Sequence, residues 1–387
     1  MMAHSLRSFP LSLPTLVLSA VLLQFIHESS REAATETSVS NLLTETDAPS
    51  GFSFAEQIRE FSFPHDHGEH PDYRSEWWYF TGNLVDETKR LYGFDLTIFR
   101  FGLAPQQNEN FDSLRTTQIF LAHFAISDVE SKRYLNAEKY SRALPDITGI
   151  TTEPVRVQVE NWFIEQVDTE TEHWRLYAAT PEVELALDLS ALRPIALQGD
   201  NGLSRKSSTP GNASYYYSIP RLSAKGELTL GDKAIVVKGN AWFDREWSTS
   251  ALESGQIGWD WFGLHLNDDT ELMYYQIRHA NGKRDEQSHG SLFLDGGQTQ
   301  IPLGKEVKLE PLAYWRSPET NARYPIAWRL SADEHLLDLE IKAKFDAQEW
   351  HESFIYWEGA VTVKGYLNSL PIDGEGFVEL TGYDRGN

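Results

Sequence analysis

From about residue 61 onward, hydrophobic and polar residues alternate along the chain with a period of two. Residues 155–160 read Val-Arg-Val-Gln-Val-Glu, and segments 183–189 and 337–345 also place an apolar residue at every second position. Alternate side chains of a β-strand share one face, so this period predicts strands with one buried face. Further strand-like runs cover residues 91–100, 118–126, 234–243, 258–266, 271–279, 354–367 and 376–382. Long helical patterns are scarce, which favours antiparallel barrels or sandwiches over βαβ units.

Two stretches of the chain resemble each other. Residues 76–100 and 259–278 each contain an aromatic strand, an acidic turn and an apolar strand that ends in arginine, Arg100 in the first and Arg278 in the second. A chain of 387 residues is long enough for about two domains. Together these observations predict two copies of one β fold.

The N-terminus is a separate piece. Arg7 precedes an uncharged run, residues 8–26, with an apolar centre. Such a segment is typical of a secretory signal or an N-terminal anchor, so we assign residues 1–27 to it. We expect an extracytoplasmic protein, periplasmic or secreted, with membrane association through residues 8–26 if the segment is retained. Residues 28–60, rich in Ser, Thr, Glu and Ala, are predicted to be a disordered linker. Two domains should follow, over residues 61–248 and 249–387.

Composition removes several classes of function. The chain has 34 basic and 57 acidic residues and a formal charge of -23, which argues against a nucleic-acid partner. It has no cysteine, which excludes disulfides, thiolate metal sites and cysteine nucleophiles. It also lacks a Gly-x-Ser-x-Gly elbow, a phosphate-binding glycine loop and a dinucleotide fingerprint. We therefore expect no cofactor. The sequence does not indicate an oligomeric state.

The most informative stretch for chemistry is residues 239–247, Gly-Asn-Ala-Trp-Phe-Asp-Arg-Glu-Trp. On a strand, Trp242, Asp244 and Glu246 point one way, with the two carboxyl groups about 7 Å apart. In an apolar cavity, burial and mutual repulsion would raise one pKa and leave an acid beside a base, which suits proton transfer. The alternative is structural, with both carboxylates paired to arginines such as Arg221 or Arg278 to brace a barrel.

Aromatic residues are candidates for the walls of a ligand cavity. Eight of the twelve tryptophans lie from residue 242 onward. Trp259 and Trp261 would share one strand face, and Tyr275 is a candidate neighbour on the next strand. Aromatic faces bind flat or polyunsaturated ligands and stabilise cations. The alternative for each tryptophan is ordinary core packing. Trp242, Trp78 and Tyr217 complete the set of candidate ligand-binding residues.

A histidine-rich segment, residues 64–70, reads Pro-His-Asp-His-Gly-Glu-His. His65, His67 and His70 are candidate metal ligands, yet the segment does not match the helical His-Glu-x-x-His arrangement. We favour a capping loop with hydrogen-bonding histidines and predict no metal. His123 lies inside an apolar strand, where a buried core histidine is the commoner outcome and a catalytic role the alternative.

Seven motifs follow one another along the chain: residues 66–70 (Asp-His-Gly-Glu-His), 76–82 (Glu-Trp-Trp-Tyr-Phe-Thr-Gly), 197–204 (Leu-Gln-Gly-Asp-Asn-Gly-Leu-Ser), 214–218 (Ser-Tyr-Tyr-Tyr-Ser), 242–247 (Trp-Phe-Asp-Arg-Glu-Trp), 258–262 (Gly-Trp-Asp-Trp-Phe) and 356–359 (Tyr-Trp-Glu-Gly). With them the chain resembles the AttH-like, lipocalin-like family, which is related to hydroxyneurosporene synthase (the CrtC-like carotenoid 1,2-hydratases) and whose members are often labelled predicted secreted hydrolases. The resemblance covers about residues 61–383. It implies an all-β fold of two tandem lipocalin-like (calycin) barrels, the first ending near residues 245–250.

The resemblance also suggests an activity. The hydratase branch adds water across an isolated C=C bond, which requires a buried acid and aromatic faces for the resulting cation. By resemblance Asp244 would be the acid, with Glu246 as second-choice acid or water-orienting base. Independently of the resemblance, Arg100, Arg221, Arg245 and Arg278 are candidates for structural ion pairs. In that branch a histidine follows the motif aspartate, whereas this chain has Arg245, which favours the AttH-like branch.

We therefore expect a protein that binds a small apolar, isoprenoid- or lipid-like molecule in an aromatic cavity at or between the barrels. As an enzyme it would hydrate or isomerise a C=C bond by acid catalysis, as a hydro-lyase. The alternatives are a non-catalytic carrier of a hydrophobic ligand and a secreted hydrolase, although no activated nucleophile is visible in the sequence.

Overall fold

The structure is a computed structural model that describes residues 51–105, 117–250, 252–267 and 269–383. The predicted signal or anchor, residues 1–27, lies outside these ranges, as does most of the predicted linker. No helical segment within them combines the length and the apolar composition that a membrane span requires. Residues 51–60 differ from the disordered linker predicted there. Phe52 and Ala55 are buried, and the backbone carbonyl of Ser53 accepts a hydrogen bond from Thr249.

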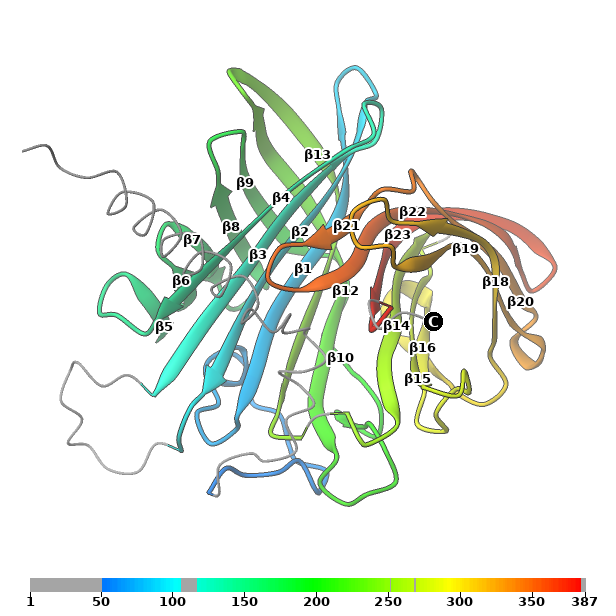
Figure 1. The fold of residues 1–387 in the computed structure, drawn as a ribbon, viewed down its shortest axis with the longest axis horizontal. Helices are drawn as coiled ribbons and strands as arrows, with labels where there is room; N and C mark the ends of the chain where they lie inside the picture. The colour runs from blue at the N-terminus through cyan, green and yellow to red at the C-terminus, as the bar shows by residue number, and fades with distance from the viewer. Residues whose placement is uncertain (1–50, 106–116, 251, 268, 384–387) are drawn as a thin grey trace, which may run out of the picture. The chain divides into compact units, whose positions relative to one another are not determined.

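The first antiparallel sheet curves into a nearly closed barrel (Figure 1). Its strands in the described ranges are β1 (Ser75–Asp86), β2 (Leu91–Gly102), β3 (Gln118–Asp128), β4 (Arg133–Arg142), β5 (Thr148–Thr152), β6 (Val155–Val159), β7 (Trp162–Asp168), β8 (His173–Ala179), β9 (Val183–Ala191), β10 (Ala196–Leu197), β11 (Leu203–Arg205), β12 (Ala213–Leu230) and β13 (Lys233–Ser248). The order is β4-β3-β2-β1-β13-β12-β9-β8-β7-β6-β5, and β10 and β11 pair with β12. A short 3-10 turn, η1 (His65–His67), precedes β1.

The second antiparallel sheet forms a half-barrel. Its strands in the described ranges are β14 (Gln256–Leu266), β15 (Glu271–His279), β16 (His289–Leu294), β17 (Thr299–Leu303), β18 (Lys308–Arg316), β19 (Arg323–Ala332), β20 (Leu337–Ala343), β21 (Glu349–His351), β22 (Ile355–Leu367) and β23 (Leu370–Thr381), with 3-10 turns η2 (Asp295–Gly297) and η3 (Asp333–His335). The order is β17-β16-β15-β14-β23-β22-β20-β19-β18, and β21 pairs with β22. The predicted all-β, lipocalin-like fold is confirmed.

The two similar stretches of sequence occupy equivalent places in the two sheets. The first stretch forms the β1–β2 hairpin, and the second forms the β14–β15 hairpin. In each sheet the first strand pairs with the last, β1 with β13 and β14 with β23. The sequence echo thus corresponds to a repeated pattern of strand pairing.

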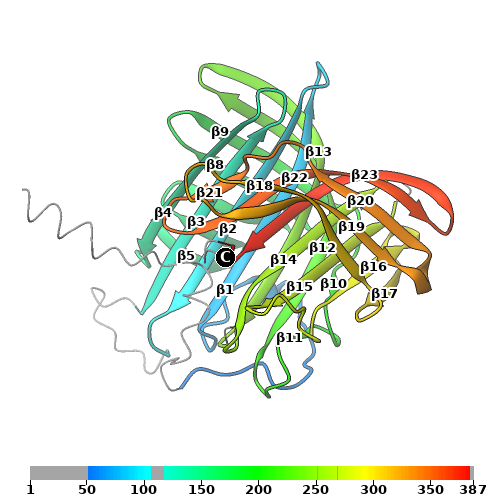
Figure 2. The same cartoon turned by 45° about the vertical axis from the view of Figure 1, so that its right-hand side comes forward.

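Each sheet has its own apolar core, and further apolar clusters lie where the two sheets meet. β22 and β23 of the second sheet lie against β2 and β1 of the first, and β15 lies against β12 (Figure 2). Strands far from this contact, such as β6 and β9, alternate between buried and more exposed residues. By contrast, the last eight residues of β13 are all buried, because one face packs into the barrel and the second sheet covers the other.

Candidate active site

The two faces of β13 have different surroundings. Phe243 and Trp247 belong to the core of the first barrel, and Arg245 lies on that side with its guanidinium 3.9 Å from the centre of the Trp78 ring. Asp244 and Glu246 point the other way, into a cavity between the two sheets. This is the separation expected of alternate residues on a strand. Trp242 lies on the same side as Asp244 but not in the cavity wall, contrary to its prediction as a ligand-binding residue.

The cavity has a volume of about 120 Å³, on the order of the space that one ring of a larger ligand occupies. Its walls come from both sheets and from the segments before β12 and β14. The lining residues are Trp77, Tyr79, Thr97, Phe99, Lys206, Tyr216, Asp244, Glu246, Ser248, Ser250 and Leu252 from the first half and Trp259, Trp261, Tyr275, Ile277, Tyr356, Glu358, Glu379 and Thr381 from the second. Eight of these nineteen residues are aromatic and nine are polar or charged, so the wall combines aromatic faces with several polar groups, as a small-molecule site does.

Neutral donors surround the Asp244 carboxyl group. Trp242 Nε1 lies 2.7 Å and Ser218 Oγ 2.5 Å from its Oδ1, and the Tyr216 hydroxyl lies 2.6 Å from its Oδ2. Burial raises the pKa of Asp244 to about 7, against the lowering effect of these hydrogen bonds, and the Glu246 charge adds to the rise. The group therefore exchanges its proton near neutral pH, as general acid–base catalysis requires.

The arginines proposed as partners of the two carboxylates pair elsewhere. Arg221 Nε lies 2.6 Å from Glu271, and Arg278 Nε lies 2.9 Å from Asp260. Both arginines thus belong to structural ion pairs. They do not form the ion pairs with Asp244 and Glu246 that the sequence offered as the structural alternative.

Glu246 forms an ion pair with Lys206. Its Oε1 lies 2.8 Å from Lys206 Nζ and also accepts a hydrogen bond from Ser214. Burial acts to lower the pKa of Lys206, but the Glu246 carboxylate and the Tyr275 hydroxyl outweigh it and the pKa is raised. Lys206 therefore keeps its proton, with its ammonium 4.5 Å from the centre of the Tyr275 ring.

Three of the predicted aromatic residues line the cavity. Trp261 pairs with Tyr275 across β14 and β15, and both belong to the wall. The Trp261 indole also donates to the Tyr216 hydroxyl at 3.2 Å. Trp259, two positions earlier on β14, donates from its indole to Glu379 at 2.8 Å.

Trp78 and Tyr217 do not line the cavity, which corrects their prediction as ligand-binding residues. Trp78 donates from its indole to the His67 carbonyl at 2.7 Å, and the Tyr217 hydroxyl lies 2.6 Å from His67 Nδ1. Both face the first barrel. A shift of one residue moves a side chain to the other face of a strand, and the residue in the wall is Tyr216.

Two carboxyl groups of the cavity come from the second sheet and were not predicted. Glu358 accepts a hydrogen bond from the Tyr79 hydroxyl at 2.6 Å, and Glu379 accepts the Trp259 bond. Burial raises the pKa of Glu379 to about 7 and that of Glu358 well above its usual range, the latter helped by Asp95 and Glu379. The usable signal was a carboxylate inside an apolar strand: Glu379 stands between Val378 and Leu380.

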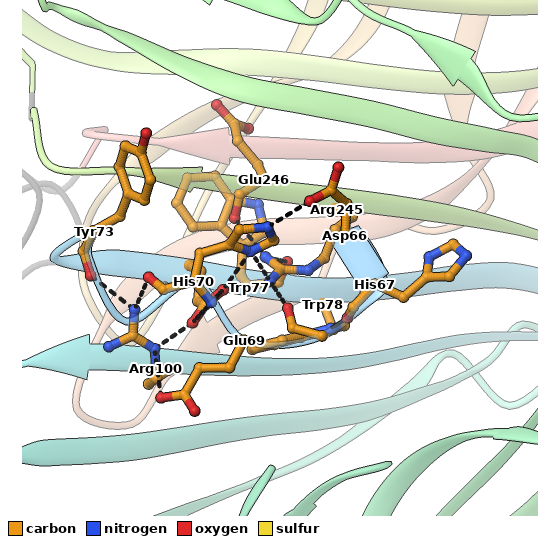
Figure 3. Close-up of polar contacts among 12 residues, drawn as sticks. Asp66, His67, Glu69, His70, Tyr73, Trp77, Trp78, Arg100, Arg245 and Glu246 are labelled. Atoms are coloured by element: carbon orange, nitrogen blue, oxygen red, sulfur yellow. Dashed lines mark hydrogen bonds and ion pairs between the residues drawn. The ribbon is translucent and has the colours of Figure 1, made fainter. Parts of the chain in front are cut away.

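A buried polar network lies next to the site, on the barrel side of β13 (Figure 3). Glu76 forms ion pairs with Arg100 and with Arg245. Burial favours the neutral acid, but the two guanidiniums outweigh it and hold the pKa of Glu76 below its usual range. His70 stacks on the Trp247 ring at 3.7 Å between centres. Arg100 and Arg245 are thus bound in structural ion pairs.

The three candidate metal ligands do not converge. The side chain of His65 is 76% exposed, whereas His67 contacts Tyr217 and Glu172, and His70 contacts Asp66 at 3.2 Å. In the part of the chain that the structure describes, no group of three or more His, Asp or Glu side chains is placed to hold a metal ion.

His123 lies outside the cavity wall, in the apolar contact between the sheets. Its ring stacks on Trp350 at 4.2 Å, and its Nδ1 lies 2.8 Å from the Tyr356 hydroxyl. Burial lowers the pKa of His123 to about 3.

Comparisons with known proteins agree with this architecture. The family model described as AttH-like matches residues 55–383. A solved AttH structure from Nitrosomonas europaea is 32% identical, with a TM-score of 0.75, and the match covers 86% of this chain and 100% of that one. Dehydratase asqC from Emericella nidulans is 23% identical over 53% of this chain and 60% of its own length. Kievitone hydratase from Fusarium solani subsp. phaseoli is 25% identical over 43% of this chain and 48% of its own length. The chain thus spans about half the length of the curated relatives it matches.

Proposed function

Since the chain belongs to the AttH-like family, we propose that it binds a small apolar molecule between its two sheets and adds water to, or removes it from, a carbon–carbon double bond. Asp244 is the acid of this reaction. The observation that carries the proposal is its position: it is 4% exposed, has neutral hydrogen-bond donors and lines an aromatic cavity. The names of two relatives, a hydratase and a dehydratase, support the same reaction class.

The surroundings of Asp244 suit an acid that must also release its proton. Burial keeps the carboxyl group protonated up to about pH 7. The donors Tyr216, Ser218 and Trp242 then stabilise the carboxylate that remains after proton transfer. A buried carboxyl group without these donors would hold its proton too tightly to act as an acid.

In the hydration direction, the Asp244 O–H bond breaks and its proton forms a C–H bond with one alkene carbon. The other carbon becomes a cation, which the face of the Trp261 indole stabilises. A water molecule forms the new C–O bond, and the proton that it releases ends on the Asp244 carboxylate, which regenerates the acid. Dehydration is the reverse: a protonated hydroxyl leaves as water, and a C–H proton is removed.

The geometry favours this reading over the two alternatives. A carrier needs no acid in the wall of its cavity, whereas Asp244 lies in the wall. Ester hydrolysis needs an activated nucleophile. Ser204 Oγ lies 3.0 Å from Lys206 Nζ, but that amine is paired with Glu246 and keeps its proton, so it is not available as a base.

The test uses the molecule that co-purifies with the native protein, identified by mass spectrometry, with kievitone as a second probe. Each is incubated with the protein in H₂¹⁸O. We expect ¹⁸O in a hydrated product, or loss of one water from the molecule in the dehydration direction, with the wild type and with the surface control Asp232→Asn, and a loss of about 10²-fold or more in rate with Asp244→Asn. A bound molecule returned unchanged by the wild type would favour the carrier, and full turnover by Asp244→Asn would contradict the role of Asp244.

A further inference from the structure

Glu379 of β23 enters the cavity from the second sheet, whereas Asp244 enters it from the first. The Trp259 indole donates to Glu379 Oε1 at 2.8 Å and so fixes the orientation of the carboxyl group. Among the described residues no hydrogen bond is found to its other oxygen, Oε2. A carboxyl group with one oxygen held and the other free is able to bind and deprotonate a small molecule in the cavity.

The charges around the cavity couple Glu379 to Asp244. Burial is the main cause that raises the pKa of Glu379, and the negative charges of Asp244 and Glu246 raise it further against the Trp259 hydrogen bond. Two carboxyl groups that repel each other in a buried cavity do not both ionise readily, so the ionisation of one favours the protonated form of the other.

We infer that Glu379 is the second catalytic carboxyl group of this site, the base that faces the acid Asp244 across the bound alkene. The inference rests on the proposed function. In hydration, Asp244 gives its proton to one carbon, and Glu379 takes a proton from the water whose oxygen bonds to the other carbon. The proton on Glu379 then returns to Asp244 through water in the emptied cavity. Dehydration is the reverse: protonated Glu379 gives its proton to the leaving hydroxyl, which departs as water, and the Asp244 carboxylate removes the C–H proton.

The other two carboxyl groups of the wall are less suited to this role. Glu246 is neutralised by Lys206 at 2.8 Å and also accepts from Ser214. Glu358 accepts from Tyr79, and burial together with Asp95 favours its neutral form so strongly that it does not act as a base near neutral pH. Glu379 therefore remains as the partner for the acid.

The first arm of the test needs no substrate. The carboxyl bands of the wild type, Asp244→Asn, Glu379→Gln and the control Glu375→Gln are followed against pH by infrared spectroscopy. Glu375 lies on the same strand but pairs with Lys344, outside the cavity wall. We expect the pH at which the Glu379 carboxyl group is half ionised to fall by about one unit in Asp244→Asn. About one unit is the strength of interaction above which two sites titrate as a pair. The control should leave both midpoints in place.

The second arm measures turnover of the co-purified molecule and of kievitone. Glu379→Gln should lose about 10²–10⁴-fold in kcat with KM little changed, while its Asp244 band still titrates and so reports an intact site. Independent titration of the two carboxyl groups, or full activity of Glu379→Gln beside an inactive Asp244→Asn, would overturn the inference and leave the proposed function standing. Full activity of Asp244→Asn would overturn the proposed function instead.

Discussion

Asp244 should make the folded protein less stable as the pH rises, and replacing it with asparagine should remove that effect. Burial raises its pKa from 3.8 to about 7. The folded protein thus holds this proton over a pH range in which the unfolded chain releases it. The stabilisation due to the bound proton is fully present below pH 3.8 and is lost as the pH rises toward 7.

The magnitude follows from the two pKa values. The interval from 3.8 to about 7 is about three pH units, and one unit corresponds to about 1.4 kcal/mol, so the full effect is about 4 kcal/mol. Asp244 is 4% exposed, so bulk solvent screens it little. Between about pH 5 and pH 8 the loss amounts to about 3 kcal/mol. That is a large share of the roughly 5–15 kcal/mol by which folded domains are usually stable.

Urea unfolding of the wild type and Asp244→Asn at about pH 5 and about pH 8 measures this effect. Taking the difference in the free energy of unfolding between the two proteins cancels the contributions of the other titrating groups, apart from those coupled to Asp244. We expect it to shift by about 3 kcal/mol in favour of asparagine at the higher pH. A constant offset across the pH range would refute the reasoning, because it would mean that the Asp244 pKa is not raised by folding.

Two further predictions concern the network and the cavity wall. Glu76→Gln leaves the buried guanidinium of Arg245 without its carboxylate, so the free energy of unfolding measured in urea should fall by about 3–5 kcal/mol. The exposed control Glu87→Gln should change it little. An equal effect of both substitutions would contradict the role of the network. In Gly263→Ala the added Cβ would lie 2.4 Å from the Trp261 indole, so the indole must move. A fluorescent apolar ligand should then bind more weakly, and the tryptophan emission of the protein should change. Unchanged binding would show that Trp261 is not part of the wall.

Much of the fold could be predicted because many strands bury only one face. In β9 and β20 the buried positions are those of the apolar residues, Val183 and Leu185 in the one and Leu337 and Leu339 in the other. Such a pattern determines both the type of element and the side that faces the core. The packing of the second sheet on the first leaves no comparable signal, because it buries a second face of strands that already have one.

The number of buried faces on each strand also explains which site residues could be predicted. Asp244 could be placed on one face with Trp242 and Glu246 because alternate residues of a strand share a face. Tyr216 and Tyr217 could not be told apart in this way, since both faces of that part of β12 are buried and both residues are tyrosines. Glu379 could not be paired with Asp244 at all, because its place depends on contacts between the two sheets and on no local pattern.

The filling of the first barrel explains why the cavity lies between the sheets. Inside the barrel Phe243 stacks on Phe80 at 4.2 Å between ring centres and packs on Trp174 at 5.1 Å, and the ion pairs of Glu76 lie at the same side of β13. An interior packed in this way has no room for a ligand. The reactive carboxyl groups are therefore carried on the outer face of the barrel, and the second sheet supplies the opposite wall. It follows that neither sheet alone contains both Asp244 and Glu379, so the acid and its partner exist as a pair only when the two sheets are packed together.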